Sequence, residues 1–145
     1  MTDWEYKFIS EQRVARLATV DAIGQPAVIP IVYAYDGVAF FTPLDAKPKR
    51  VAAVQLQRVR NINANPNVAV IIDSYSEDWR RVAWVHVRGR ARIITDGDEY
   101  TAGITLLGAK YPQYEHMPLA GRPIILIEPT SIRSWRASDA TALLD

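Results

Sequence analysis

One long segment with strict alternation constrains the fold more than any other part of the sequence. In residues 82–94 (VAWVHVRGRARII), small or aliphatic side chains alternate with aromatic, imidazole and guanidinium groups. A period of two is typical of a β-strand with one face on a core. Such a strand would span roughly 43 Å, so in a small domain it must bend, and we expect the bend at Gly89. One face would carry Ala83, Val85, Val87, Gly89, Ala91 and Ile93, and the other Trp84, His86, Arg88, Arg90 and Arg92.

Shorter β-rich segments surround this strand. We expect strands at 14–20, 26–35, 38–42, 68–73 and 123–133, with a hairpin turn at Asp36-Gly37. The segment 27–35 is apolar at nearly every position, so both of its faces should be covered, as inside a barrel or at a dimer seam. Pro30 cannot donate to a ladder and therefore marks an edge, a bulge or the approach of another group.

Helical spacing occurs in three places. Residues 2–13 predict a short amphipathic helix capped by Thr2 and lying on the core, and residues 96–110 predict another helix, followed by a loop at 111–122. Residues 49–64 predict a helix that Asn65-Pro66 ends. Many strands with few, short helices favour a mainly β fold, a closed or split barrel with flanking helices. No repeat or linker divides residues 1–145, so we expect a single domain.

Composition excludes several classes of protein. The 145 residues carry 17 Lys and Arg against 16 Asp and Glu, and this near balance argues against a nucleic-acid or anionic-membrane partner. Cysteine is absent and histidine occurs twice, so neither thiolate chemistry nor a histidine-rich metal site is expected; Glu115 and His116 alone are too few ligands. No secretory signal or membrane span is evident, and a cytoplasmic protein is expected. Serine-hydrolase, P-loop and Rossmann motifs are missing.

A cluster of cations and a hydroxyl near position 50 is the first candidate site. Thr42, Lys47, Lys49 and Arg50 come just before the helix expected at 49–64, and Arg58 lies within that helix. Helix amides, a hydroxyl and cations are the groups that hold a phosphate. The alternative is a loop of solvated cations, with Arg58 in a surface ion pair.

Two tryptophans and one face of the long strand form a second candidate region. Trp79 and Trp135 lie at strand ends in polar surroundings, where an indole either stacks on a planar heterocycle or caps the core. The polar face of the long strand is either a solvated or dimer-facing surface or part of a ligand groove. On this face, His86 is the one candidate proton donor near neutral pH.

Several strings, taken in order, resemble one known family. The chain resembles the pyridoxamine 5′-phosphate oxidase-like split β-barrel flavoproteins, and within them the branch that uses the deazaflavin coenzyme F420. The resemblance covers nearly the whole chain. It rests on RVARLATVDAIGQPAVIPIVYAYDG (13–37), FFTPLDAKPKR (40–50), RVRNINANPNVAVIID (58–73), DWRRVAWVHVRGRARI (78–93) and PIILIEPTSIRSW (123–135).

The resemblance implies a homodimer of six-stranded antiparallel split barrels, with a flavin-type cofactor in each of two interface clefts. The family's phosphate-binding cation, seven residues before the Asn-Pro pair, would be Arg58, and its hydroxyl residue would be Thr42. Trp79 and Trp135 match the family's aromatic positions. The strand lying against the tricyclic ring would contribute Val28, Ile29, Pro30 and Ile31.

One departure concerns the segment between Thr42 and Arg58, which is longer than the usual family pattern and contains Lys47 and Lys49. Coenzyme F420 carries a lactyl-polyglutamate tail beyond its phosphate, and we hypothesise that these lysines, with Arg50, hold its carboxylates.

The function implied is an oxidoreductase in which reduced deazaflavin passes hydride to a small unsaturated substrate. The chemistry then belongs to the cofactor, and no catalytic side chain is assigned. The alternatives are an FMN-dependent oxidase or reductase, and a non-catalytic protein that binds a flavin or deazaflavin.

Overall fold

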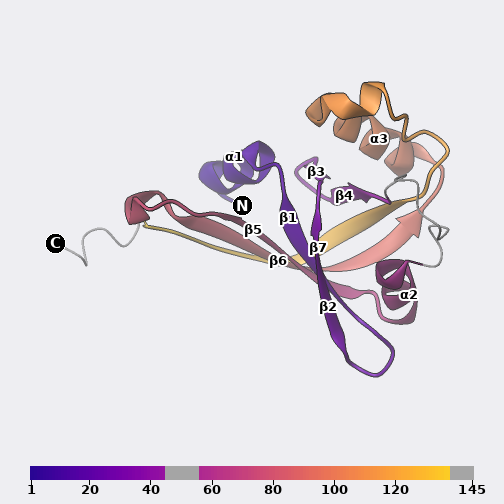
Figure 1. The fold of residues 1–145 in the computed structure, drawn as a ribbon, viewed down its shortest axis with the longest axis horizontal. Helices are drawn as coiled ribbons and strands as arrows, with labels where there is room; N and C mark the ends of the chain where they lie inside the picture. The colour runs from indigo at the N-terminus through magenta and orange to yellow at the C-terminus, as the bar shows by residue number, and fades with distance from the viewer. Residues whose placement is uncertain (45–55, 138–145) are drawn as a thin grey trace.

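The computed structural model describes residues 1–44 and 56–137. Within these ranges a strongly curled sheet is flanked by three helices (Figure 1). In chain order the elements are α1 (Asp3–Glu11), β1 (Ala15–Val20), β2 (Pro26–Ile31), β3 (Ala34–Tyr35), β4 (Phe40–Pro43), α2 (Gln57–Ala64), β5 (Asn67–Ser74), the 3-10 turn η2 (Trp79–Arg81), β6 (Ala83–Ile94), α3 (Asp98–Lys110), the 3-10 turn η3 (Pro112–Glu115) and β7 (Ile124–Arg136).

The sheet is antiparallel throughout and has the order β2-β1-β5-β6-β7-β4-β3. Its two edge strands, β2 and β3, are separated in sequence only by Val32 and Tyr33. The chain therefore joins the two edges of the sheet and closes it into a split barrel. The described residues form seven strands rather than the six expected, because the strand expected at 26–35 is interrupted at residues 32 and 33.

The long strand bends at Gly89, as its sequence predicts. β6 pairs with β7 along its whole length, and the register shifts between Arg88 and Gly89. A Cβ atom at Gly89 would lie 2.7 Å from the carbonyl oxygen of Glu128, so only glycine allows the two backbones to approach this closely. From Ala83 to Arg92 the buried and more exposed positions alternate as predicted. In Figure 1, β5, β6 and β7 form a long arm that ends at the turn containing η2.

The helices cover the open parts of the barrel. Thr2 caps α1 in a capping box with Glu5, and Ile9 of α1 is fully buried in the barrel core. That core also receives Val59 and Ile62 from α2. A second apolar cluster lies beneath α3, where Leu107 packs with residues from β4 and β7.

Three of the boundaries and burial patterns differ from expectation. The expected covering of both faces of 27–35 is not found within the single chain, and its covering at a dimer seam stays a prediction. β2 is an edge strand, its exposure alternates, and Val28 is 64% exposed. The helix expected at 49–64 is present from Gln57 to Ala64, and residues 49–55 lie outside the described part. β7 continues to Arg136, because it pairs with the whole of β6. In the described ranges no helix is long and apolar enough to cross a membrane.

Candidate functional site

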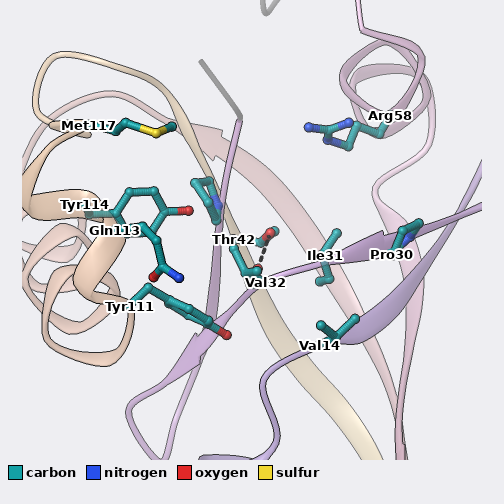
Figure 2. Close-up of a pocket in the computed structure, with 11 residues that line it drawn as sticks. Val14, Pro30, Ile31, Val32, Thr42, Arg58, Tyr111, Gln113, Tyr114 and Met117 are labelled. Atoms are coloured by element: carbon teal, nitrogen blue, oxygen red, sulfur yellow. Dashed lines mark hydrogen bonds between the residues drawn. The ribbon is translucent and has the colours of Figure 1, made fainter. Parts of the chain in front are cut away.

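A cavity of about 400 Å³ lies between α2, the split in the barrel and the segment around η3. Figure 2 shows Arg58 extending into it from one side, while Gln113, Tyr114 and Met117 reach into it from the opposite side. The floor is largely apolar. The lining residues are Val14, Pro30, Ile31, Val32, Thr42, Pro43, Arg58, Tyr111, Gln113, Tyr114 and Met117.

Arg58 lies in the first turn of α2, where the N–H groups of Val59 and Arg60 donate to the carbonyl oxygen of Leu56 at 3.1 Å. Leu56, the N-cap, makes no side-chain capping bond. The helix is fixed to the barrel by a buried polar contact, in which the amide of Asn61 donates to the hydroxyl of Thr19 on β1 at 2.9 Å. A cation and the positive end of a helix dipole therefore lie together at one end of the cavity.

Thr42 is almost fully buried in β4. Its hydroxyl donates to the carbonyl oxygen of Val32 at 2.8 Å, across the split in the barrel (Figure 2). The hydroxyl proton is thus engaged, while the oxygen retains capacity to accept a bond from a ligand. The observed role of the predicted hydroxyl residue is to satisfy the backbone where β2 has ended, and its role in binding a cofactor stays a prediction.

Tyr111, directly after α3, forms hydrogen bonds to backbone groups at the same split in the barrel. Its hydroxyl accepts a bond from the Tyr33 N–H at 3.1 Å and lies 2.8 Å from the carbonyl oxygen of Arg13. Burial raises the pKa of Tyr111, so the phenol stays protonated at neutral pH and donates. The ammonium group of Lys110, behind this wall, lies 3.9 Å from the centre of the Tyr33 ring.

The cavity brings together four of the predicted site residues, namely Pro30, Ile31, Thr42 and Arg58. Val28 and Ile29 lie on β2 but do not line the cavity; Val28 is exposed, and Ile29 packs against the barrel core. Lys47, Lys49 and Arg50 lie outside the described residues. Their assignment stays a prediction.

Both tryptophans lie elsewhere in the single chain. Trp79 is 71% exposed in η2, at the end of the arm, where its indole nitrogen lies 3.4 Å from the Tyr75 hydroxyl. Trp135 on β7 is paired in register with Trp84 on β6. His86 lies on this same face of β6 and lines a separate surface hollow with Arg88 and Arg133. None of these side chains lines the cavity.

Gln113, Tyr114 and Met117 line the cavity but are not predicted from the sequence. They belong to the segment expected as a loop, which contains the short turn η3. A glutamine and a tyrosine in a loop carry no periodic signal, and only their position after the helix ending at Lys110 places them at the barrel split.

Comparisons with known proteins support the fold described above. No match was found among curated proteins. Among solved structures, the conserved hypothetical protein Rv2991 from Mycobacterium tuberculosis is similar, with a TM-score of 0.74 and 19% identity over 97% of this chain and 88% of that one. HutZ, the heme storage protein from Vibrio cholerae, has a TM-score of 0.70 and 19% identity over 92% and 93%. An F420 reductase has a TM-score of 0.62 and 26% identity over 88% and 94%.

A family model described as pyridoxamine 5′-phosphate oxidase matches residues 2–136, which is nearly the whole chain. The curled antiparallel sheet, the closure at residues 32 and 33 and the flanking helices agree with that match. The chain belongs to the pyridoxamine 5′-phosphate oxidase family and has its split-barrel fold.

Proposed function

We propose that the cavity binds the phosphate and ring of a flavin-type cofactor, with coenzyme F420 ahead of FMN. We further propose that the protein is an oxidoreductase acting on a small unsaturated substrate. The main observation behind the proposal is that Arg58, Thr42 and the apolar end of β2 line the same cavity of about 400 Å³. A volume of this size is within the range of cofactor pockets. The similarity to an F420 reductase supports the choice of deazaflavin.

The lining fits such a group in its chemistry. Arg58 and the N-terminal amides of α2 provide a cationic end suited to a phosphate. The side chains of Ile31, Val32 and Met117 offer apolar surface to a planar ring. The predicted cations Lys47, Lys49 and Arg50 remain our proposal for the carboxylates of an F420 tail.

The described lining contains no carboxylate, histidine or lysine. The chain's own residues would therefore bind and orient the cofactor rather than move a proton. When bound, reduced deazaflavin supplies the hydride, and the protein supplies position and electrostatics. A lining without carboxylate, histidine or lysine is equally compatible with a second candidate function, a carrier that binds the cofactor without turnover.

We also propose a homodimer. The outward face of β6 and β7 exposes Trp135 (37%) beside Trp84, together with His86, Arg88 and Arg133. A second copy covering this face would bury both indoles. Trp79 and Trp135 would then approach a cofactor only across the interface, because neither lines the cavity of its own chain.

The test is a titration of the purified protein with F420 and with FMN, followed by tryptophan fluorescence. We expect Arg58→Ala to weaken binding at least tenfold, since a charge-assisted bond to phosphate is lost. Arg60→Ala is the matched control: Arg60 is exposed, is on the same helix and does not line the cavity. Equal binding by all three proteins would contradict the phosphate assignment.

Turnover separates the two candidate functions. Oxidation of reduced F420 by a panel of enones and quinones, lost in Arg58→Ala, would support the oxidoreductase. Tight binding with no oxidation across the panel would support the carrier instead.

A further inference from the structure

We propose that Gln113 recognises the imide edge of the bound ring, the O=C–NH–C=O group at the pyrimidine end of the tricycle. The inference rests on the proposed function, since it assumes that the cavity holds a flavin-type ring. It assigns the far wall of the cavity a role that neither the sequence patterns nor the family match provides.

The position of Gln113 is the first argument. Arg58 lines the cavity from α2, and Gln113 lines it from the opposite wall, with Thr42 between them (Figure 2). If the phosphate binds at Arg58, the ring extends toward the wall that carries Gln113 and Tyr114. Met117, on the same wall, is 45% exposed and offers no hydrogen-bonding partner suited to the ring's N–H and C=O groups, whereas Gln113 does.

The chemistry of the amide is the second argument. A carboxamide offers a donor and an acceptor side by side, and an imide offers the complementary acceptor and donor. Two parallel hydrogen bonds can therefore form between them. The side chain of Gln113 makes no hydrogen bond to any residue in the described ranges, so its donors and acceptor are available to a ligand. The described lining carries no carboxylate that would compete for the imide N–H.

The third argument is that the wall is held in place. Tyr111 is anchored through its hydroxyl to the backbone of Tyr33 and Arg13. The Tyr114 N–H donates to the Tyr111 carbonyl at 3.1 Å, and the two rings pack edge to face with centroids 6.1 Å apart. Gln113 lies between these two residues in the turn η3, so little ordering of the backbone is needed when a ring binds.

The imide edge is common to FMN and F420, so the inference does not depend on which cofactor the protein prefers. It does predict that methylation at the imide nitrogen, N3, harms binding. A methyl group removes the donor that Gln113 accepts and pushes the amide away from the neighbouring carbonyl.

The experiment compares FMN with 3-methyl-FMN on three full-length proteins by calorimetry or fluorescence titration. For wild type we expect 3-methyl-FMN to bind about tenfold more weakly than FMN, the size of effect expected when one or two hydrogen bonds to the ligand are lost. Gln113→Met keeps the length of the side chain and removes both polar groups, so its FMN affinity should fall and its preference for FMN over 3-methyl-FMN should vanish. Gln25→Met, in the exposed turn between β1 and β2, should behave as wild type.

The possible results separate the role of Gln113 from the proposed function. Loss of discrimination in Gln113→Met alone supports the inference. Discrimination that survives in Gln113→Met overturns it while leaving the proposed function standing, since FMN still binds. If wild type binds F420 but not FMN, an F420 affinity that is unchanged in Gln113→Met overturns the inference, and a weakened one supports it. If neither cofactor binds to wild type, the proposed function fails and the inference fails with it.

Discussion

The phenol oxygen of Tyr111 lies 3.1 Å from the backbone nitrogen of Tyr33, at the point where β2 has ended and β3 has not begun. A side chain here takes the place of a neighbouring strand, because the two edges of the barrel separate at residues 32 and 33 and leave this backbone without a ladder partner. Thr42 does the same for the carbonyl of Val32. The residues that close the barrel are thus also residues that line the cavity.

The Tyr111 hydroxyl should therefore matter for stability. Tyr111→Phe leaves the buried Tyr33 N–H without an acceptor, so we expect the free energy of unfolding to fall by about 1–3 kcal/mol. Urea denaturation followed by circular dichroism measures this. Tyr6→Phe is the control, because Tyr6 is 46% exposed on α1. We expect this variant to change the free energy of unfolding by no more than about 0.5 kcal/mol. Equal losses in the two variants would show that the hydroxyl bond contributes nothing particular.

Because Lys110 is buried, we expect its contribution to the free energy of unfolding to increase with pH. Burial, followed by the charge of Arg13, lowers the pKa of Lys110 from 10.5 to about 8, while the face of the Tyr33 ring partly stabilises the ammonium. Below pH 8 the folded protein must hold a charged, buried group. Between pH 8 and 10.5 the unfolded chain binds more protons than the folded one, so this group's contribution to stability rises with pH.

Lys110→Met removes the free-energy cost of holding a charged ammonium group in a buried position. We expect the variant to be more stable than wild type at pH 7 by about 1–2 kcal/mol, less than the shift alone implies because the ring contact is lost. The difference should shrink as pH rises from 8 toward 10.5. Thermal unfolding of both proteins across this range measures it, and comparing them cancels the tyrosines that titrate nearby. Lys7→Met, at an exposed lysine, should show no such trend. A difference that grows with pH would contradict the assignment.

Local patterns predicted most of the fold. The alternation at 82–94, the Asp36-Gly37 turn and the Thr2 cap each follow from interactions within a few residues. The turn and the cap are confirmed, and the alternation is confirmed from Ala83 to Arg92 but not at its end, where Ile94 rather than Ile93 is buried. Gly89 could also be predicted, because a strand longer than the domain has to bend and glycine is where it does so.

Long-range contacts explain what local patterns missed. Nothing in PAVIPIVYAY shows that the strand stops at Ile31, because the groups that satisfy the backbone there come from Thr42 and from Tyr111, which is 78 residues from Tyr33. The lining of the cavity was predicted only in part for the same reason. Arg58 and Thr42 were candidates from the cluster of cations and a hydroxyl and from the family resemblance, whereas the position of Gln113 depends on how the segment after α3 returns to the barrel.

Replacing Gly89 or Gly108 by alanine should change the free energy of unfolding in opposite directions. A Cβ at Gly89 would meet the carbonyl oxygen of Glu128 at 2.7 Å and the side chain of Ile127 at 2.9 Å, and neither can move without disturbing β7. We expect Gly89→Ala to lower the free energy of unfolding by about 2 kcal/mol or more. Gly108→Ala, in α3 with nothing within 4 Å of the new methyl group, should raise it by about 0.5–1 kcal/mol. Chemical denaturation of both variants tests the pair, and destabilisation by Gly108→Ala would contradict it.

The buried contact between Asn61 and Thr19 should position Arg58. Asn61 is 2% exposed, and its amide joins α2 to β1 at 2.9 Å. Asn61→Leu leaves the Thr19 hydroxyl without its partner, so we expect a loss of about 1–3 kcal/mol in stability and a several-fold weaker affinity for the phosphate-bearing cofactor. Thr19→Val combined with Asn61→Leu removes both polar groups, and the two changes should be non-additive, with part of the stability recovered.

Cofactor affinity distinguishes positioning from a general loss of stability. If α2 is displaced in Asn61→Leu, the affinity falls under conditions where circular dichroism shows the protein fully folded, and it falls further for FMN than for riboflavin, which lacks the phosphate that Arg58 would hold. An equal loss for both ligands would mean that the Asn61 contact supports the barrel as a whole. The position of Arg58 would then depend on Val59 and Ile62, the apolar residues through which α2 packs on the core.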